Sequence, residues 1–377
     1  MARSYLDFAS TTPLLPAALD AMIEVSRAIA AGQLGDPSRS HSEGLAAREL
    51  VERCRSQVAT ALGARPREVV FCSGATEACA LASFGATSLD SARTHSVLSA
   101  VEHAAVRTWA ERGPHTTVAV DSSGRVDAAS FVSAVRDDTA IAHLQWANHE
   151  VGTIQPVAAV AAGLRERHGV LFHVDAAQAV GRVAVDFAAS GVDLMSVSGH
   201  KFGAPTGIGA LLVRRGVRVD PLISGGDQER ARRAGMENIA AIVGFATAIS
   251  ECAATLDVEA ARLRSLRSRV AAWAAGADGV SVLGHRDEVV PHLVCLEIDG
   301  VEPQPVLIGL DRAGIAVHSG NSCSSEALEP SPVLAAMGSA AQHSLRISLG
   351  HCTTDGDLDR LLIALPEVLA QLRSLRR

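Results

Sequence analysis

Lys201 is the residue whose type and position best suit covalent chemistry. It is the chain's one lysine: of the 34 Lys and Arg residues, all the others are arginines. Arginine supplies surface charge equally well, whereas a Schiff base requires a primary amine that can lose its proton. A lysine surviving by chance in an arginine-rich composition is the alternative. The position of Lys201 after a strand-like apolar run, beside Ser198 and His200, favours a Schiff base with a carbonyl cofactor.

Apolar runs of strand composition alternate with helical stretches through the first two thirds of the chain. The runs lie near 69–72, 96–101, 140–145, 170–175, 192–198 and 208–213. This alternation predicts an α/β fold with a large, doubly wound, mostly parallel sheet. Such sheets bind ligands at the carboxyl ends of their strands. Six candidate residues follow strand ends, and we expect them to form one site: Thr76, His103, Asn148, Asp175, His200 and Lys201.

Thr76 and Asp175 each allow two interpretations. Ser73-Gly-Ala-Thr76 follows a strand and opens a helix, which makes either an anion site or an ordinary helix cap. Asp175 either caps a helix or holds a pyridinium nitrogen protonated, as pyridoxal phosphate (PLP) requires to act as an electron sink. Because a candidate Schiff-base lysine lies downstream, the sequence favours PLP.

Two further residues, in the C-terminal third of the chain, have side chains that could take part in catalysis or substrate binding. Cys323 lies among small and polar residues at 319–330, which predicts a loop and makes its thiol either a nucleophile or an incidental exposed group. Arg346 lies in the strand-like run 343–349. It is either a surface residue or a bidentate clamp for a substrate carboxylate.

The length of 377 residues predicts a large domain and a smaller one. Helical spacing covers 15–31, 46–62 and a long stretch from 239 to about 275, and a glycine-punctuated, arginine-rich loop is expected at 214–238. The remainder has α+β character, with a strand at 290–298 and a helix at 305–313. We place the large domain at 15–255 and the small one at 1–14 plus 256–377.

Composition excludes several classes of function. The net charge of −7 and the lack of a basic run argue against direct nucleic-acid binding. The start of the chain has no apolar signal region, and we expect no membrane segment and a cytoplasmic location. The seven cysteines show no CxxC pair, so we expect neither a metal site nor disulfides.

Several motifs together resemble those of the cysteine desulfurases, which are PLP-dependent enzymes of the class V aminotransferase fold. The resemblance spans 5–354 and rests on Ser198-Gly-His-Lys201, Ser73-Gly-Ala-Thr76, Glu102-His103, the pair Asp175 and Gln178, and the Cys323 loop. It implies the PLP-dependent transferase fold, with a large doubly wound domain and a smaller α+β domain. It also implies a homodimer, because active sites in this family take residues from both subunits.

The resemblance also implies residue roles. Lys201 forms the Schiff base and moves the Cα proton, His103 stacks on the ring, and Cys323 attacks the sulfur of L-cysteine. That attack leaves a persulfide and releases L-alanine. Arg346 and Asn148 are expected near the substrate. The implied cofactor-binding set is Ala75, Thr76, His103, Asn148, His149, Asp175, Gln178, Ser198, His200 and Lys201.

Four positions depart from the family's usual pattern. His149 and Met236 stand where an asparagine and a threonine are usual, while Asp36 and Ala80 replace two further asparagines. These changes suggest a specialised desulfurase that serves one protein sulfur acceptor, in DNA phosphorothioation, tRNA thiolation, iron–sulfur assembly or a biosynthetic pathway. Two alternatives stay open: another PLP-dependent lyase, transaminase or epimerase on this fold, and a catalytically inactive scaffold subunit.

Overall fold

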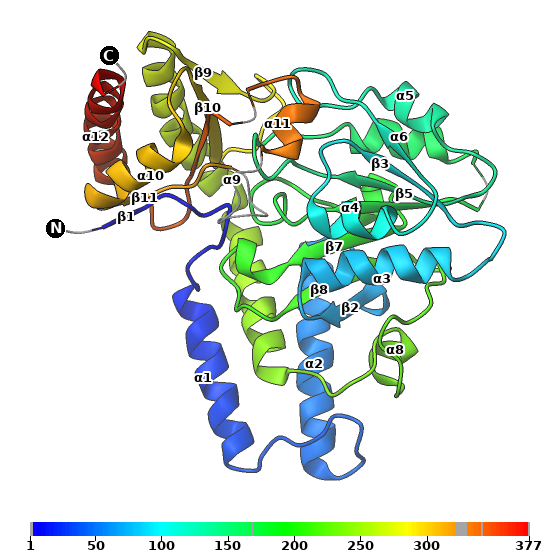
Figure 1. Cartoon of the computed structure of the whole chain (residues 1–377). Coiled ribbons are helices and arrows are strands. Elements are labelled where there is room, and N and C mark those ends of the chain that lie inside the picture. Colours follow the sequence, from blue (N-terminus) through cyan, green and yellow to red (C-terminus); the bar gives the residue numbers. More distant parts are fainter. Residues whose placement is uncertain (1–2, 168, 321–329, 341, 376–377) are drawn as a thin grey trace.

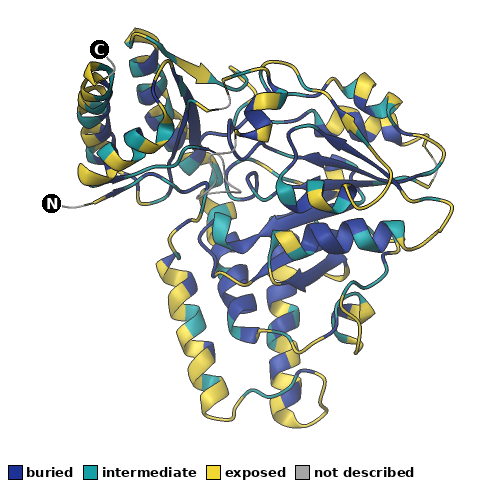
Figure 2. Cartoon of the chain, viewed as in Figure 1, coloured by how far each residue is buried: buried dark blue, intermediate teal, exposed yellow. Residues whose placement is uncertain are grey.

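The computed structural model describes residues 3–167, 169–320, 330–340 and 342–375. Figure 1 shows a large sheet with helices packed around it and a smaller lobe beside it that holds both ends of the chain. Helices α1 and α2 extend away from the sheet toward the bottom of this view. Most strands of the large sheet are buried, whereas the outer faces of α1 and α2 are exposed (Figure 2).

The large sheet is mostly parallel, as predicted. Its seven strands pair in the order β2-β8-β7-β6-β5-β3-β4, and only the pairs that β8 makes are antiparallel. β8 follows β7 after a short turn around Lys201, which leaves no room for a helical crossover. The strands are β2 (Val69–Cys72), β3 (His95–Ser99), β4 (His115–Val118), β5 (Thr139–Gln145), β6 (Leu171–Asp175), β7 (Leu194–Ser198) and β8 (Gly209–Val213).

Most strands of this sheet are followed by a helix. The predicted helices at 15–31 and 46–62 are present as α1 and α2. The predicted loop 214–238 contains one short turn, labelled α8, in which Glu229, Arg230 and Ala231 have positive φ angles of 49°, 59° and 58°. The helices of this part are α1 (Pro16–Ala30), α2 (Ser42–Ala61), α3 (Ala75–Thr87), α4 (Ala104–Ala110), α5 (Ala128–Ser133), α6 (Val157–Leu164), α7 (Phe187–Ser190) and α8 (Gln228–Ala231).

The long helix α9 (Ile239–Gly276) connects the two lobes. Its first part packs in the core of the large lobe, and its later part, from Leu263 onward, packs in the core of the small one. Within the described residues, α9 is long and apolar enough to cross a membrane by length and composition alone. Half of its apolar window is buried inside the protein, so core packing accounts for its composition.

The small lobe is built on an antiparallel sheet. In it, β10 (Leu293–Ile298) lies between β9 (Val280–Leu283) and β12 (Ser344–Ser348), while β1 (Ser4–Tyr5) pairs in parallel with β11 (Ile315–Ala316). The N-terminal segment therefore belongs to this lobe, with Leu6 in its core. The remaining helices are α10 (Pro303–Arg312), α11 (Pro332–Ala336) and α12 (Asp355–Ser374).

We propose that the domain boundary falls inside α9, near residue 255. The two separate hydrophobic clusters support this division. Leu293, Val333 and Leu334 pack with the cluster of the large lobe, although they follow the boundary in sequence. This contact joins the two lobes beside the carboxyl ends of the parallel strands.

Candidate active site

A cavity of about 270 Å³ lies at the carboxyl ends of the parallel strands. It is lined from the N-terminal segment, from the turns that follow β2, β3, β5, β6 and β7, and from β12 of the small lobe. Of the six residues expected to converge, Asn148 is not among the described residues that line it. The lining residues are Ala9, Ser10, Ala75, Thr76, His103, Ala105, Gln145, Ala147, His149, Asp175, Ala177, Gln178, Ser198, His200, Lys201 and Arg346.

Lys201 ends a single helical turn directly after β7, and its amine is buried in the cavity wall. The Nζ atom donates to the carbonyl oxygens of Ala9 at 2.6 Å and Ser10 at 2.9 Å. Burial, and then the positive charge of Arg346, lower the pKa of Lys201 to about 8. At neutral pH a useful fraction of the amine is therefore unprotonated and nucleophilic.

Asp175 ends β6 and is buried in the cavity wall. One carboxylate oxygen accepts from the amide of Ala177 at 2.9 Å, and burial raises the pKa of Asp175. Gln178 donates to the carbonyl of Ala9 at 2.9 Å and lies on the same wall. A buried carboxylate of this kind gains most from a cationic partner, and a protonated pyridine nitrogen is one that fits the space.

The turn between β2 and α3 forms the other end of the cavity. Ala75 and Thr76 open α3, where free backbone amides favour an anion, and Ser198 and His200 face the same space. Gly209 allows this turn to lie against β8, because a Cβ at that position would be 2.5 Å from the Val197 oxygen and 2.7 Å from the Gly74 Cα. Hydroxyl, imidazole and amide donors thus suit a phosphate group.

His103 and His149 form an edge-to-face pair on the wall of the cavity. Their ring centroids are 5.0 Å apart at 80°. The Nδ1 atom of His103 accepts from the amide of Ala105 at 3.1 Å, so the neutral ring carries its proton on Nε2. Burial and the neighbouring His149 lower the pKa of His103 to about 4, and burial lowers that of His149 to about 3. Both rings are therefore neutral at physiological pH.

His149 has an unusual environment for a buried histidine. Its Nδ1 atom has no hydrogen-bond partner among the described residues, and its Nε2 atom lies 3.6 Å from the Glu150 carboxylate. Asn148, beside it, points elsewhere: its amide donates to Val101 and its oxygen accepts from the amides of Glu150 and Val151. Asn148 therefore shapes the turn that presents His149 to the cavity.

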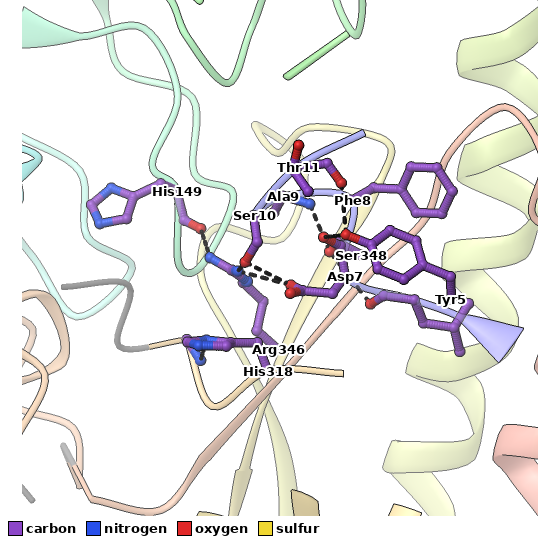
Figure 3. Close-up of polar contacts among 12 residues, drawn as sticks. Tyr5, Asp7, Phe8, Ala9, Ser10, Thr11, His149, His318, Arg346 and Ser348 are labelled. Carbon is purple, nitrogen blue, oxygen red and sulfur yellow. Dashed lines mark hydrogen bonds and ion pairs between the residues drawn. The ribbon is translucent and has the colours of Figure 1, made fainter. Parts of the chain in front are cut away.

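Arg346 lies in the middle of β12 and is only 1% exposed, which excludes the interpretation that it is a surface residue. Its Nη1 atom donates to the His149 carbonyl at 2.8 Å, and Nη2 donates to Asp7 at 3.1 Å and to the Ser10 hydroxyl at 2.7 Å (Figure 3). Its Nε atom is buried without a partner among the described residues. Arg346 thus reaches the cavity from the small lobe.

A chain of buried polar side chains lies behind Asp175. Cys79 contacts both Asp175 and Ser196, and Ser196 lies 2.7 Å from Nε2 of His173. The Nδ1 atoms of His173 and His143 are 2.9 Å apart, so one ring donates and the other accepts. Sequence patterns did not indicate this network, since its histidines alternate with apolar residues inside strands.

The predicted nucleophile Cys323 lies outside the described residues, so its role stays a prediction. The described residues before it run beside Arg346, where His318 and Arg346 exchange backbone hydrogen bonds. After it, the hydroxyl of Ser331 donates to Glu150 at 2.5 Å. Among the described cysteines none lines the cavity, and within the same part of the chain no cluster of His, Cys, Asp or Glu could hold a metal ion.

Met236 is 61% exposed. It lies near the turn before α3, where Arg233 forms an ion pair with Glu77 at 2.9 Å. Glu77 in turn accepts from the amide of Ser73 at 2.8 Å. The segment that contains Met236 therefore supports the turn between β2 and α3 through Arg233.

The buried lysine, the buried carboxylate and the anion-binding turn in one cavity fit PLP. A sequence model of the family Aminotransferase class-V matches residues 4–361. A cysteine desulfurase of Cereibacter sphaeroides is 42% identical, with 100% of this chain and 98% of that protein covered.

Two solved structures extend the comparison. A NifS-like protein matches with a TM-score of 0.90 and 30% identity, covering 98% of this chain and 100% of that one. A structure of SspA in complex with cysteine matches with a TM-score of 0.77 and 27% identity, covering 92% and 98%. The chain therefore belongs to the class V aminotransferase family and, within it, to the PLP-dependent cysteine desulfurases.

Proposed function

We propose that this protein converts L-cysteine to L-alanine and passes the sulfur, through a persulfide on Cys323, to a protein acceptor. The observation that carries the proposal is the Lys201 amine, buried in one cavity with Asp175, His103 and Arg346. Structure comparison adds a protein of similar fold whose structure was solved with cysteine.

The cavity residues would hold PLP, which supplies an electron sink for chemistry at the substrate Cα when it is bound. Asp175 keeps the ring nitrogen protonated, while Thr76, Ser198, His200 and the start of α3 hold the phosphate. The neutral amine of Lys201 takes the Cα proton and returns it. Arg346 holds the substrate carboxylate, and neutral His103 offers a hydrogen-bond donor at Nε2.

Sulfur transfer requires one further nucleophile, for which we propose the thiolate of Cys323. A sulfur–sulfur bond forms as the Cβ–S bond of the substrate breaks, and the electron pair of that bond remains with the carbon skeleton. The skeleton takes up protons and leaves as L-alanine, and the persulfide remains on the protein. Atoms and electrons balance without an external oxidant.

We also propose a cytoplasmic homodimer. Support for the dimer comes from apolar side chains on the outer faces of α1 and α2, since Leu19, Ile29 and Leu45 are 41–49% exposed. The free thiols among the described residues support a reducing compartment. His149, which stands in place of the usual asparagine and whose Nδ1 atom has no partner among the described residues, supports a site specialised for one dedicated acceptor.

The test is turnover of L-cysteine by the purified protein, assayed for alanine and for persulfide on Cys323. Cys323→Ser should bind cysteine and form neither product. Cys352→Ser is the matched control, because Cys352 is the exposed cysteine within the described residues, and it should behave as wild type.

Three outcomes would contradict the proposal. Alanine or pyruvate formation that survives Cys323→Ser would favour a lyase. A protein that stays colourless after PLP is added would favour an inactive scaffold. Efficient delivery of sulfur to several unrelated acceptors would remove the idea of a dedicated partner.

A further inference from the structure

Ser10 lines the cavity, and its hydroxyl accepts a hydrogen bond from Nη2 of Arg346. We propose that Ser10 sets the affinity of the site for the α-carboxylate of its substrate, by competing with that carboxylate for the Nη2 protons of Arg346. The inference rests on the proposed role of Arg346 as the carboxylate clamp. It concerns binding, so it can be tested apart from turnover.

The donors of Arg346 define what a carboxylate can use. A guanidinium group has five N–H bonds, and a carboxylate that binds it in bidentate fashion takes two of them on one edge. Within the described residues Nε has no partner, whereas Nη2 donates to both Asp7 and Ser10. Nε and Nη2 share an edge, so the free Nε–H cannot form a bidentate pair until Asp7 or Ser10 withdraws.

Ser10 is the partner that withdraws more readily. Asp7 carries a negative charge and is held to the buried guanidinium by Coulombic attraction as well as by a hydrogen bond, whereas Ser10 offers only a hydrogen bond. The Ser10 hydroxyl is neutral, lines the cavity and moves by rotation about one bond. It also donates to Asp7 at 2.9 Å.

The backbone of the same segment is held independently of this hydroxyl. The amide of Ala9 donates to the Ser348 hydroxyl at 2.9 Å, and the Tyr5 hydroxyl donates to the carbonyls of Asp7 and Thr11 (Figure 3). The carbonyl of Ser10 that accepts from Lys201 is also backbone. Ser10→Ala therefore removes the competing group and leaves the segment in place.

We expect Ser10→Ala to lower the KM for L-cysteine by about three- to tenfold, the range for loss of one competing hydrogen bond, with kcat changed less than about twofold. The control is Ser26→Ala, because the Ser26 hydroxyl donates to the Met22 carbonyl of its own helix at the surface. Thermal unfolding of both variants checks that the fold is intact.

Calorimetry on the PLP-loaded protein separates the carboxylate from the rest of the substrate. β-Mercaptopropionate has the carboxylate and thiol of cysteine without the amine, and cysteamine has the thiol and amine without the carboxylate. Ser10→Ala should bind β-mercaptopropionate about three- to tenfold more tightly and cysteamine as wild type does.

An unchanged or weaker affinity for β-mercaptopropionate would overturn the inference. So would an equal gain for both probes, because Ser10 would then act on the space in the cavity and not on Arg346. If wild type fails to form alanine, the proposed function fails, while the calorimetric comparison still decides the role of Ser10.

Discussion

Replacing Arg55 by methionine should destabilise the protein far more than the same change at Arg53. Arg55 lies on the buried face of α2 and is 3% exposed. Its Nη1 and Nη2 atoms donate to the two carboxylate oxygens of Glu229 at 2.7 and 2.9 Å, and Glu229 also accepts from the amide of Phe71 at 2.9 Å. The ion pair thus ties α2 to α8 and to β2, which leads into the anion-binding turn.

The magnitude follows from burial. Arg55→Met leaves the Glu229 carboxylate, only 2% exposed, without its cation, and removing one partner of a buried pair costs about 3–5 kcal/mol. Arg53 pairs with Glu49 at 2.7 Å on the same helix, but these side chains are 60% and 73% exposed, and such a pair contributes about 0.3–0.5 kcal/mol. For a chain of 377 residues the larger loss lowers Tm by about 4–6 °C.

The assay is denaturant and thermal unfolding of wild type, Arg55→Met and Arg53→Met at fixed protein and PLP concentrations. A third variant, Arg55→Met with Glu229→Gln, removes the orphaned charge and should recover part of the lost stability. The reasoning is refuted if Arg55→Met falls within about 1 kcal/mol of Arg53→Met, or if the double variant is no more stable than Arg55→Met.

Two further predictions concern residues that pack behind the cavity wall, Glu102 against Gln145 and Gly209 against Gly74. Burial raises the pKa of Glu102 from 4.5 to about 8, so its contribution to stability is full below pH 4.5 and is lost as pH rises through 8, at up to about 1.4 kcal/mol per pH unit. Unfolding at pH 5, 7 and 9 should therefore show Glu102→Gln gaining stability relative to wild type as pH rises, and parallel pH curves would contradict this. Gly209→Ala places a Cβ 2.5 Å from the Val197 oxygen, so the anion-binding turn must shift. Fluorescence titration of the apoprotein should show PLP affinity at least about tenfold lower than in Gly276→Ala, whose added Cβ meets no atom within 4 Å; equal affinities would exclude a role for this close approach.

The broad architecture and part of the site could be predicted from local patterns. Alternating strand-like and helical stretches predicted the mostly parallel sheet, and the structure confirms it. The carboxyl ends of parallel strands share one edge, so Thr76, His103, Asp175 and Lys201 face one cavity. The chemical distinction between lysine and arginine was enough to single out Lys201.

Other predictions required the folded chain. The sequence left two interpretations of Arg346, and burial excluded the surface one because Asp7 and Ser10, more than 330 positions away, supply its partners. Asn148 follows a strand end like its neighbours, yet its side chain bonds Val101 and the turn. The expected loop at 214–238 contains α8, where Glu229 meets Arg55.

The sequence by itself therefore determined the type of fold, the one amine available for a Schiff base and the residues that follow strand ends. Only the tertiary structure decided which side chains bind Arg346, which histidine rings contact one another, and which carboxylates are buried away from solvent. The physical reason is range: periodicity and composition report the geometry of a few neighbouring residues, whereas partners and burial depend on contacts between residues hundreds of positions apart.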